Sequence, residues 1–507
     1  MEKQSRECFE VYITRKGPVL ISGPNRVAVL HSVIGRSDSN TKAVELCNVT
    51  ADTGLPKSSI FSTLEDLVKK RVLRYGTVAG KKGYELDSYR IISSADPHPE
   101  YADFGKEVLA NAPENYTMDR MELDYMATAA LTYGMDISPL MKTVGYDFGK
   151  YILRCYPDRD TALEKLFDWY CRLETAKVRV ISMLPLSVEI EYTFKSVTGE
   201  LARMFSCLIL SSVASIVEDG YNAIIDRIEV DANRAIGTFR FDKSAKDRDL
   251  VPMDFEYEED AGTDFMIFIS PGGAFRCVDN PLGLAILEAM QLGVPMSSAD
   301  ITRSLKIDEK KPQSSVLFYL EKMISVGLIE EMDVIGKRKF VKTAGDLYTW
   351  SLDDLLVPYD PFVRCHETFD DPASANGNIL STMIRRLGSL RIAIGPIIGR
   401  LSRSLAKEFC NMAEKKTIES ILSTVMDRAH WFRFSETSVT SFVPFTFVRK
   451  LRPDVDEIIL NTQMVFDTMF FKTIIREITG VEYGSECTPY NTGDSRGYKL
   501  VYQLQNR

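Results

Sequence analysis

The chain carries the same sequence pattern twice, 256 positions apart. Residues 58–73 align without a gap on residues 314–329. The same offset relates two further pairs of segments, residues 80–84 with 336–340 and residues 9–14 with 265–270. A duplicated unit of this length predicts a molecule built from two halves that are related by a pseudo-twofold axis.

Composition places the chain among ordinary folded proteins. Its 507 residues are enough for several domains, and 45% of them are hydrophobic and 26% charged. The longest apolar run, residues 204–217, is too short to cross a bilayer, so we expect a buried helix there and no membrane partner. The N-terminal residues show no apolar stretch with a cleavage site, and we therefore expect a cytoplasmic protein.

Residues that bind metals or perform covalent catalysis do not form recognisable motifs. The nine cysteines include no Cys-x-x-Cys pair, which argues against a disulfide framework and a zinc ribbon. Of the four histidines, only His366 stands beside other ligand types, Cys365 and Glu367, and adjacent side chains point in different directions. Nucleophile elbows, phosphate-binding loops and dinucleotide fingerprints are missing. We predict no metal, no cofactor and no enzymatic activity.

The segment 8–92 is predicted to contain a strand, three short helices and two strands around a basic turn. An amphipathic helix covers residues 26–34, and Gly54 ends the next helix. The third helix begins near Lys57, and its apolar residues recur at spacings of three and four, which places on one face Ile60, Leu64, Leu67 and Val68. The hairpin that follows has its tip at residues 79–83.

The segment 264–345 repeats each of these pieces. Helices are predicted over residues 283–290 and 301–307 and from Gln313, followed by a basic turn at residues 335–339. An insertion at residues 308–312 lengthens the turn before the third helix.

These two segments resemble the winged helix-turn-helix of the ArsR-like regulators, in which a serine followed by spaced leucines and a glycine or basic residue marks the recognition helix and its exit. The resemblance covers about a third of the chain. It implies a regulator of archaeal or bacterial type that binds double-stranded DNA.

Local charge distinguishes the two copies within a chain of net charge −9. Residues 22–92 hold 11 basic and 7 acidic residues, whereas residues 281–345 hold 9 and 8. A recognition helix needs short polar donors and a cation near its N-terminus, and wing cations hold phosphates. The first-copy candidates are Lys57, Ser58, Ser59, Ser62, Lys69, Lys70, Arg74, Lys81 and Lys82. The second-copy candidates are Lys310, Lys311, Gln313, Ser314, Ser315, Lys337, Arg338 and Lys339.

The second copy also presents two aromatic residues on its third helix. Phe318 and Tyr319 could contact thymine methyl groups or pack against another domain. Because winged helices also serve as protein-interaction modules, a docking role for these units stays open.

The remaining segments, 93–243 and 346–507, share a second pattern of a helical first half, a strand pair, a long apolar helix and a final strand pair. In the first segment the strands and helix are predicted at residues 178–184, 187–194, 199–219 and 224–241. In the second they are predicted at residues 431–434, 441–448, 455–479, 480–483 and 497–504. Glycine pairs that allow close helix packing recur 250 positions apart, at Gly145 with Gly149 and at Gly395 with Gly399.

This pattern resembles the 4-vinyl reductase domain, a small-molecule-binding α/β module found behind DNA-binding or signalling domains in bacteria and archaea. The resemblance implies an apolar ligand held between helix and sheet. The candidate lining residues are Phe445, Phe447, Met464, Phe466, Met469 and Phe470, a stripe that is equally the pattern of a packed core. Metal or haem clusters of cysteine or histidine, which some members carry, are not visible here.

The patterns together predict a multi-domain α+β protein in which two winged-helix domains alternate with two vinyl-reductase-like domains. The predicted boundaries are 8–92, 93–243, an acidic linker 244–263, 264–345 and 346–507. The leading hypothesis is a transcriptional regulator that acts as a single-chain pseudo-dimer and senses a ligand or partner. The alternatives are a non-enzymatic scaffold protein and an enzyme or carrier in tetrapyrrole metabolism, and assembly into a homodimer stays open.

Overall fold

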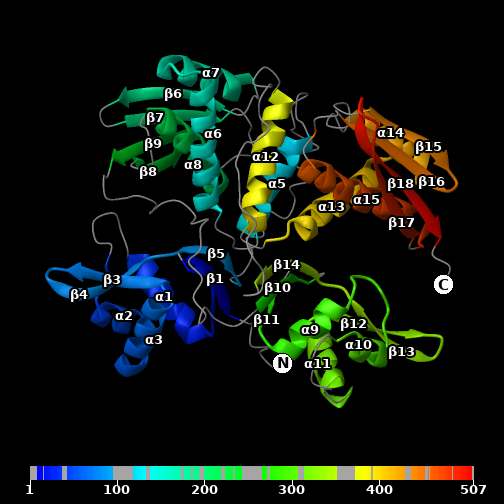
Figure 1. Ribbon diagram of the computed structural model, residues 1–507, viewed down its shortest axis with the longest axis horizontal. Helices are drawn as coiled ribbons and strands as arrows, with labels where there is room; N and C mark the ends of the chain where they lie inside the picture. The colour runs from blue at the N-terminus through cyan, green and yellow to red at the C-terminus, as the bar shows by residue number, and fades with distance from the viewer. Residues whose placement is uncertain are drawn as a thin grey trace.

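Helices and several small sheets alternate along the described part of the chain in the computed structural model (Figure 1). The structure describes residues 8–14, 16–36, 43–94, 118–132, 137–172, 176–183, 186–192, 199–217, 223–231, 234–241, 265–270, 275–305, 313–350, 372–389, 392–428, 436–451, 455, 457–481 and 483–504. This mixture of helices and sheets confirms the predicted α+β class. The predicted linker, residues 244–263, lies outside the described residues.

Residues 9–93, the first unit, combine a three-stranded sheet, three helices and a two-stranded hairpin. The elements are β1 (Phe9–Thr14), β2 (Gly17–Ser22), α1 (Pro24–Arg36), α2 (Leu46–Thr53), α3 (Lys57–Lys69), β3 (Leu73–Val78), β4 (Lys81–Leu86) and β5 (Tyr89–Ser93). As predicted, Gly54 ends α2, with a φ of 64° and its N–H bonded to the carbonyl of Thr50. Also as predicted, α3 buries Ile60, Leu64 and Leu67, and the strands β2 and β5 add a sheet that the sequence did not predict.

Residues 265–350, the second unit, have the same order of elements. They are β10 (Phe265–Ile269), β11 (Phe275–Val278), α9 (Pro281–Ala289), α10 (Ser298–Ser304), α11 (Gln313–Ser325), β12 (Ile329–Val334), β13 (Lys337–Lys342) and β14 (Gly345–Trp350). The sheet order β11-β10-β14 repeats the order β2-β1-β5. Both hairpins turn through two residues of positive φ, Ala79-Gly80 and Ile335-Gly336, which also lie 256 positions apart.

The two remaining parts, which we name the first and second modules, also share one order of elements. The first module contains α5 (Met118–Thr132), α6 (Ser138–Cys155), α7 (Arg159–Arg172), β6 (Ala176–Met183), β7 (Leu186–Tyr192), α8 (Gly199–Val217), β8 (Ala223–Asp231) and β9 (Arg234–Phe241). The second contains α12 (Pro372–Ser389), α13 (Gly395–Met412), α14 (Ile418–Arg428), β15 (Glu436–Phe442), β16 (Phe445–Leu451), α15 (Glu457–Thr479), β17 (Tyr483–Asn491) and β18 (Arg496–Leu504). Their sheet orders, β6-β7-β9-β8 and β15-β16-β18-β17, correspond strand by strand.

Two strand predictions in the second module are wrong. Residues 441–448 form the end of β15, a turn at Val443-Pro444 and the start of β16 instead of one strand. Proline has no N–H to donate to a sheet ladder, so the chain turns there. The strand β17 begins at Tyr483 and not at Gly480. The strand predicted at residues 431–434 lies outside the described residues.

One large apolar core is shared by the two modules and by one face of each three-stranded sheet. In β1, Phe9, Val11 and Ile13 point into this core, whereas Tyr12 points into the separate core of the first unit. The strand β10 alternates in the same way between the shared core and the core of the second unit. Each sheet therefore connects a unit to the rest of the molecule.

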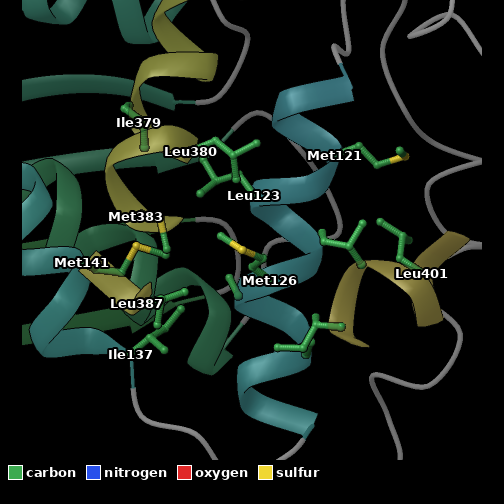
Figure 2. Packing of buried hydrophobic residues seen from close by; sticks show 14 of the residues in the cluster. Met121, Leu123, Met126, Ile137, Met141, Ile379, Leu380, Met383, Leu387 and Leu401 are labelled. Atoms are coloured by element: carbon green, nitrogen blue, oxygen red, sulfur yellow. The ribbon is translucent and has the colours of Figure 1, made fainter. Parts of the chain in front are cut away.

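Helices α5 and α12 lie between the two modules (Figure 1). Figure 2 shows Leu123 and Met126 of α5 beside Leu380, Met383 and Leu387 of α12, whereas Met121 projects from the other side of α5, where Leu401 of α13 lies. Helix α5 contacts α8 of its own module and α13 of the other, and α12 correspondingly contacts α15 and α6. The buried side chain of Arg386 on α12 donates to Asp147 on α6, which adds an ion pair between the two halves.

The glycine pairs differ between the modules. A methyl group at Gly145 would lie 2.2 Å from the carbonyl oxygen of Leu208 on α8, so the predicted close helix packing is confirmed for the first pair. In the second module, nothing described lies within 4 Å of such a group at Gly395, and at Gly399 the nearest atom is Cγ of Met469 at 3.7 Å. The close-packing prediction is therefore wrong for Gly395, which begins α13, whereas the buried Gly399 faces Met469 on α15 with room for a methyl group.

The apolar run 204–217 lies in α8 and is buried, as predicted. Among the described helices, α15 alone is long and apolar enough to cross a membrane by length and composition. Most of this apolar window, 61%, is buried inside the protein, where α15 packs against α13 and its own sheet.

Candidate nucleic-acid interface

Helix α3 turns a polar face away from the core of the first unit. Its buried edge fixes its orientation, and Lys57, Ser58, Ser59 and Ser62 are exposed on the other side. The first turn follows Pro56, and no side chain hydrogen bond caps it within the described part of the chain. The N-terminal N–H groups of a helix attract anions when they are left open in this way.

The six predicted phosphate-binding cations of the first unit fall into two groups. Lys57, Lys69 and Lys81 are exposed, and no described carboxylate lies within ion-pair distance of them. The other three cations are already paired within the unit: Lys70 with Asp66 at 3.3 Å, Arg74 with Glu85 and with Asp87 at 3.7 Å, and Lys82 with Glu65 at 3.2 Å. Cations of the first group are therefore the ones available to an external anion.

Glu65 on α3 joins the helix to the hairpin. Its carboxylate accepts hydrogen bonds from the hydroxyl groups of Tyr75 (2.6 Å) and Tyr84 (2.9 Å) and from Nζ of Lys82 (3.2 Å). The hydrogen bond from Tyr75 lowers the pKa of Glu65 most, and those from Tyr84 and Lys82 lower it further. Sequence reasoning missed Glu65, Tyr75 and Tyr84, because helical periodicity does not show what a neighbouring hairpin contacts.

In the second unit, α11 carries a mixed face. Gln313 and Ser314 are exposed, Ser315 is half-buried, and Nε2 of Gln313 donates to Oγ of Ser298 at 3.0 Å. Phe318 is 65% exposed and its ring centroid lies 5.5 Å from that of Tyr319. Lys310 and Lys311 lie outside the described residues.

The hairpin of the second unit is more acidic than that of the first. Lys337 is exposed, but Arg338 pairs with Glu321 and Glu331, and Lys339 lies 3.6 Å from Asp300. The strand β12 has acidic residues exposed where β3 has none, namely Glu330, Glu331 and Asp333 in place of Arg74, Tyr75 and Thr77. Charge that would repel phosphate is therefore present on this hairpin.

The predicted ligand-lining residues lie together between β16 and α15. Phe445, Phe447, Phe466 and Phe470 are buried, and Met464 and Met469 are half-buried. The phenylalanine rings of this set contact one another and Phe471. The ring centroids are 4.4 Å apart for Phe447 and Phe471 and 5.8 Å apart for Phe466 and Phe470. This is the packing of a core, and a ligand in this place stays a prediction.

A buried ion pair lies beside these aromatic residues and was missed. Nε and Nη2 of Arg449 donate to both carboxylate oxygens of Asp467, at 2.8 and 3.0 Å, and the hydroxyl group of Tyr498 donates to Asp467 at 2.7 Å. Burial lowers the pKa of Arg449, but the Asp467 carboxylate more than offsets this, so that the pKa is raised overall. Bidentate pairing of this kind stabilises two charges that have no access to water.

A second buried carboxylate lies at the base of the first unit. Glu10 on β1 accepts from Tyr12 (2.6 Å) and Ser93 (3.1 Å), contacts Nε2 of His31 at 2.8 Å, and pairs with Arg90 at 3.2 Å. Burial acts to raise the pKa of Glu10, but the hydrogen bonds with His31 and Tyr12 outweigh it and lower the pKa. This cluster ties α1 and β5 to β1.

Within the described residues, no group of three or more His, Cys, Asp or Glu side chains is placed to hold a metal ion. No protein-family model, no curated protein and no solved structure matches the chain.

Proposed function

We propose that this chain is a DNA-binding transcriptional regulator whose first unit contacts the duplex. The observation that carries the proposal is the exposed face of α3, where Lys57 and three serines lie on the same unit as Lys81 of the hairpin, which is exposed and has no ion-pair partner among the described residues. Three helices followed by a hairpin is the element order of a winged helix-turn-helix, which places its third helix in the major groove.

Each part of this face has a role in the proposed complex. The serine hydroxyl groups and Lys57 reach base edges and phosphates, because the first turn of a recognition helix enters the groove. Lys69 and Lys81 contact the phosphate backbone on either side. The two units of one chain would reach successive major grooves only when they are about 34 Å apart, so their separation sets the affinity.

The modules are proposed to control that separation. Each unit is joined to the shared core through one face of its sheet, so a shift of the modules would move the units. A ligand or partner biases such an equilibrium only by its difference in affinity for the two arrangements. The ligand class, an apolar small molecule, rests on the vinyl-reductase resemblance.

A second candidate function, in which only the first unit contacts DNA and the second unit docks a protein, is favoured by a specific observation. Phe318 on α11 is 65% exposed and Ile335 at the hairpin tip is 93% exposed, next to the acidic strand β12. Large exposed apolar residues favour contact with a protein surface. The neighbouring acidic residues carry the same negative charge as phosphate and would repel a DNA backbone.

Fluorescence anisotropy with mixed-sequence duplex DNA at low and moderate salt tests the proposal. We expect binding that weakens as salt rises, and Lys57→Glu and Lys81→Glu should each weaken it further. Lys81→Ala should reduce the slope of log affinity against log salt concentration by about one. Lys415→Glu, in the exposed turn between α13 and α14, is the matched control and should leave binding unchanged. A lack of binding at low salt, or binding indifferent to both first-unit reversals, would overturn the proposal.

A further inference from the structure

Both units contain an ion pair between the third helix and the returning strand of the hairpin, at equivalent positions. In the first unit, Glu65 on α3 pairs with Lys82 on β4. In the second, Glu321 on α11 pairs with Arg338 on β13. Both partners are displaced by the same 256 positions as the rest of the repeat.

The surroundings of the pair changed between the units, while the pair itself was kept. In the first unit, Nζ of Lys82 lies 3.8 Å from the centre of the Tyr75 ring and 5.5 Å from that of Tyr84. In the second unit, the guanidinium of Arg338 lies 5.0 Å from the centre of the Phe340 ring and also pairs with Glu331 at 2.8 Å. An acid on the helix, a cation on the strand and an aromatic ring beneath the cation are common to both. We call this arrangement the helix–hairpin clamp.

Stability and attraction to DNA do not explain the clamp. An exposed ion pair contributes only about 0 to 1 kcal/mol to folding. A carboxylate on the face proposed to meet DNA repels phosphates and neutralises a lysine that would otherwise attract them. The acid therefore weakens the electrostatic attraction of the face on which it lies.

The clamp is explained by its effect on the angle between α3 and the hairpin. The hairpin β3–β4 is a two-stranded sheet whose base packs into the core of the first unit through Leu73 and Tyr84, and Tyr84 also forms a backbone bridge with Val44. A two-stranded hairpin is only marginally stable by itself. Glu65 gathers three side chains of the hairpin onto one residue of α3, which fixes the angle between the two elements.

We infer that Glu65 is a positioning residue for DNA binding, which holds the hairpin so that Lys81 and the N-terminal turn of α3 reach the duplex together. The inference rests on the proposed function for its DNA readout, whereas the clamp itself does not. Preorganisation of this kind raises affinity by lowering the ordering cost of binding.

The variant Glu65→Ala separates positioning from simple electrostatics. Removal of an acid from a DNA-binding face should tighten binding if charge alone mattered. Positioning predicts the opposite, a loss of about fivefold to tenfold in affinity for mixed-sequence duplex DNA at low salt. Lys82→Arg introduces the cation of the second unit and should bind within about twofold of the unaltered chain, because the clamp is kept. Equal or tighter binding by Glu65→Ala would overturn the inference.

Hydrogen exchange of residues 73–86 without DNA provides an independent readout. Glu65→Ala, and the milder Glu65→Gln, should speed exchange in the first hairpin and leave the second hairpin unchanged. Glu321→Ala should show the reverse pattern and serves as the matched control. If the unaltered chain does not bind DNA, the proposed function fails. Hydrogen exchange alone then shows whether Glu65 holds the hairpin in place. Unchanged exchange in the first hairpin of both Glu65 variants would overturn it.

Discussion

At the scale of single residues, buried polar groups make the two halves different. Glu10 is 1% exposed and holds His31, Tyr12 and Arg90 around it. In the second unit, the positions equivalent to Glu10, His31 and Tyr12 are apolar. They are Met266, Leu287 and Phe268, respectively. A buried carboxylate therefore joins the first unit to its sheet, whereas in the second unit the buried Lys342 donates to the carbonyl of Leu287 at 3.0 Å beside the Phe268 ring.

This junction predicts how the stability of the first unit depends on pH. The pKa of Glu10 is lower in the folded protein than the value of about 4.3 in an unfolded chain. Its contribution is thus present above the unfolded pKa and is lost as the pH falls through the folded one. In urea unfolding followed by circular dichroism, we expect Glu10→Gln to lower the free energy of unfolding at pH 7 by about 1 to 3 kcal/mol and to flatten its fall between about pH 5 and pH 3.

The exposed Glu436 on β15 is the matched control, because its removal should leave the pH dependence unchanged. If the free energy of unfolding fell equally with decreasing pH in Glu10→Gln and in the unaltered chain, Glu10 would not be the source of this pH dependence.

The residues of this cluster also show where prediction from sequence ends. The exposed lysine and serines of α3 could be predicted, because helical spacing separates them from Ile60, Leu64 and Leu67. Glu10 and Arg90 are 80 positions apart and meet only because β1 pairs with β5, a pairing that the sequence did not indicate. The same reason applies to Glu65, whose partners lie on a separate hairpin.

At the scale of elements, both modules bring their two long helices together, but the glycine pairs stand at different positions in the matching helices. Gly145 and Gly149 bring α6 against α8, and a methyl group at Gly149 would lie 2.3 Å from the carbonyl oxygen of Ser212. In the corresponding helix α13, which like α6 has a proline as its second residue, Ser402 stands at the place of Gly145, and its hydroxyl group donates to the carbonyl of Phe466 on α15. Gly395 and Gly399 lie seven positions earlier in the helix than Gly145 and Gly149, where a methyl group has room. The sequence showed the glycine pair twice but could not show what faces it, since that depends on the partner helix.

Alanine substitutions at these glycines should have opposite effects. Gly145→Ala forces α6 and α8 apart and should lower the free energy of unfolding by about 1 to 3 kcal/mol. Gly399→Ala meets only an ordinary contact with Met469 and should be neutral or stabilise α13 by up to about 1 kcal/mol. Urea unfolding of the two variants side by side checks this. Equal destabilisation would show that Gly145 and Gly399 do not differ in the room they leave for a methyl group.

At the scale of the whole molecule, the two halves are joined by a common core. Helices α5 and α12 each pack against both modules (Figure 1), and the buried pair of Arg386 with Asp147 crosses between them. A pseudo-dimer built in this way resembles an obligate dimer, in which neither half buries its apolar surface alone. The proposed control of the distance between the two units requires that the shared core holds the two modules together.

A chain cut within residues 244–263 tests that joint. The two fragments, produced together, should elute as one complex with the mass of the intact chain, because the shared core needs both. Arg386→Ala leaves Asp147 buried without its partner, at a cost of about 3 to 5 kcal/mol, so the fragments should bind roughly 100-fold or more weakly. Arg303→Ala removes an exposed pair with Asp300 and should leave their affinity unchanged. Fragments that elute as separate folded monomers would show that the halves are independent, and the units could not then be coupled through the modules.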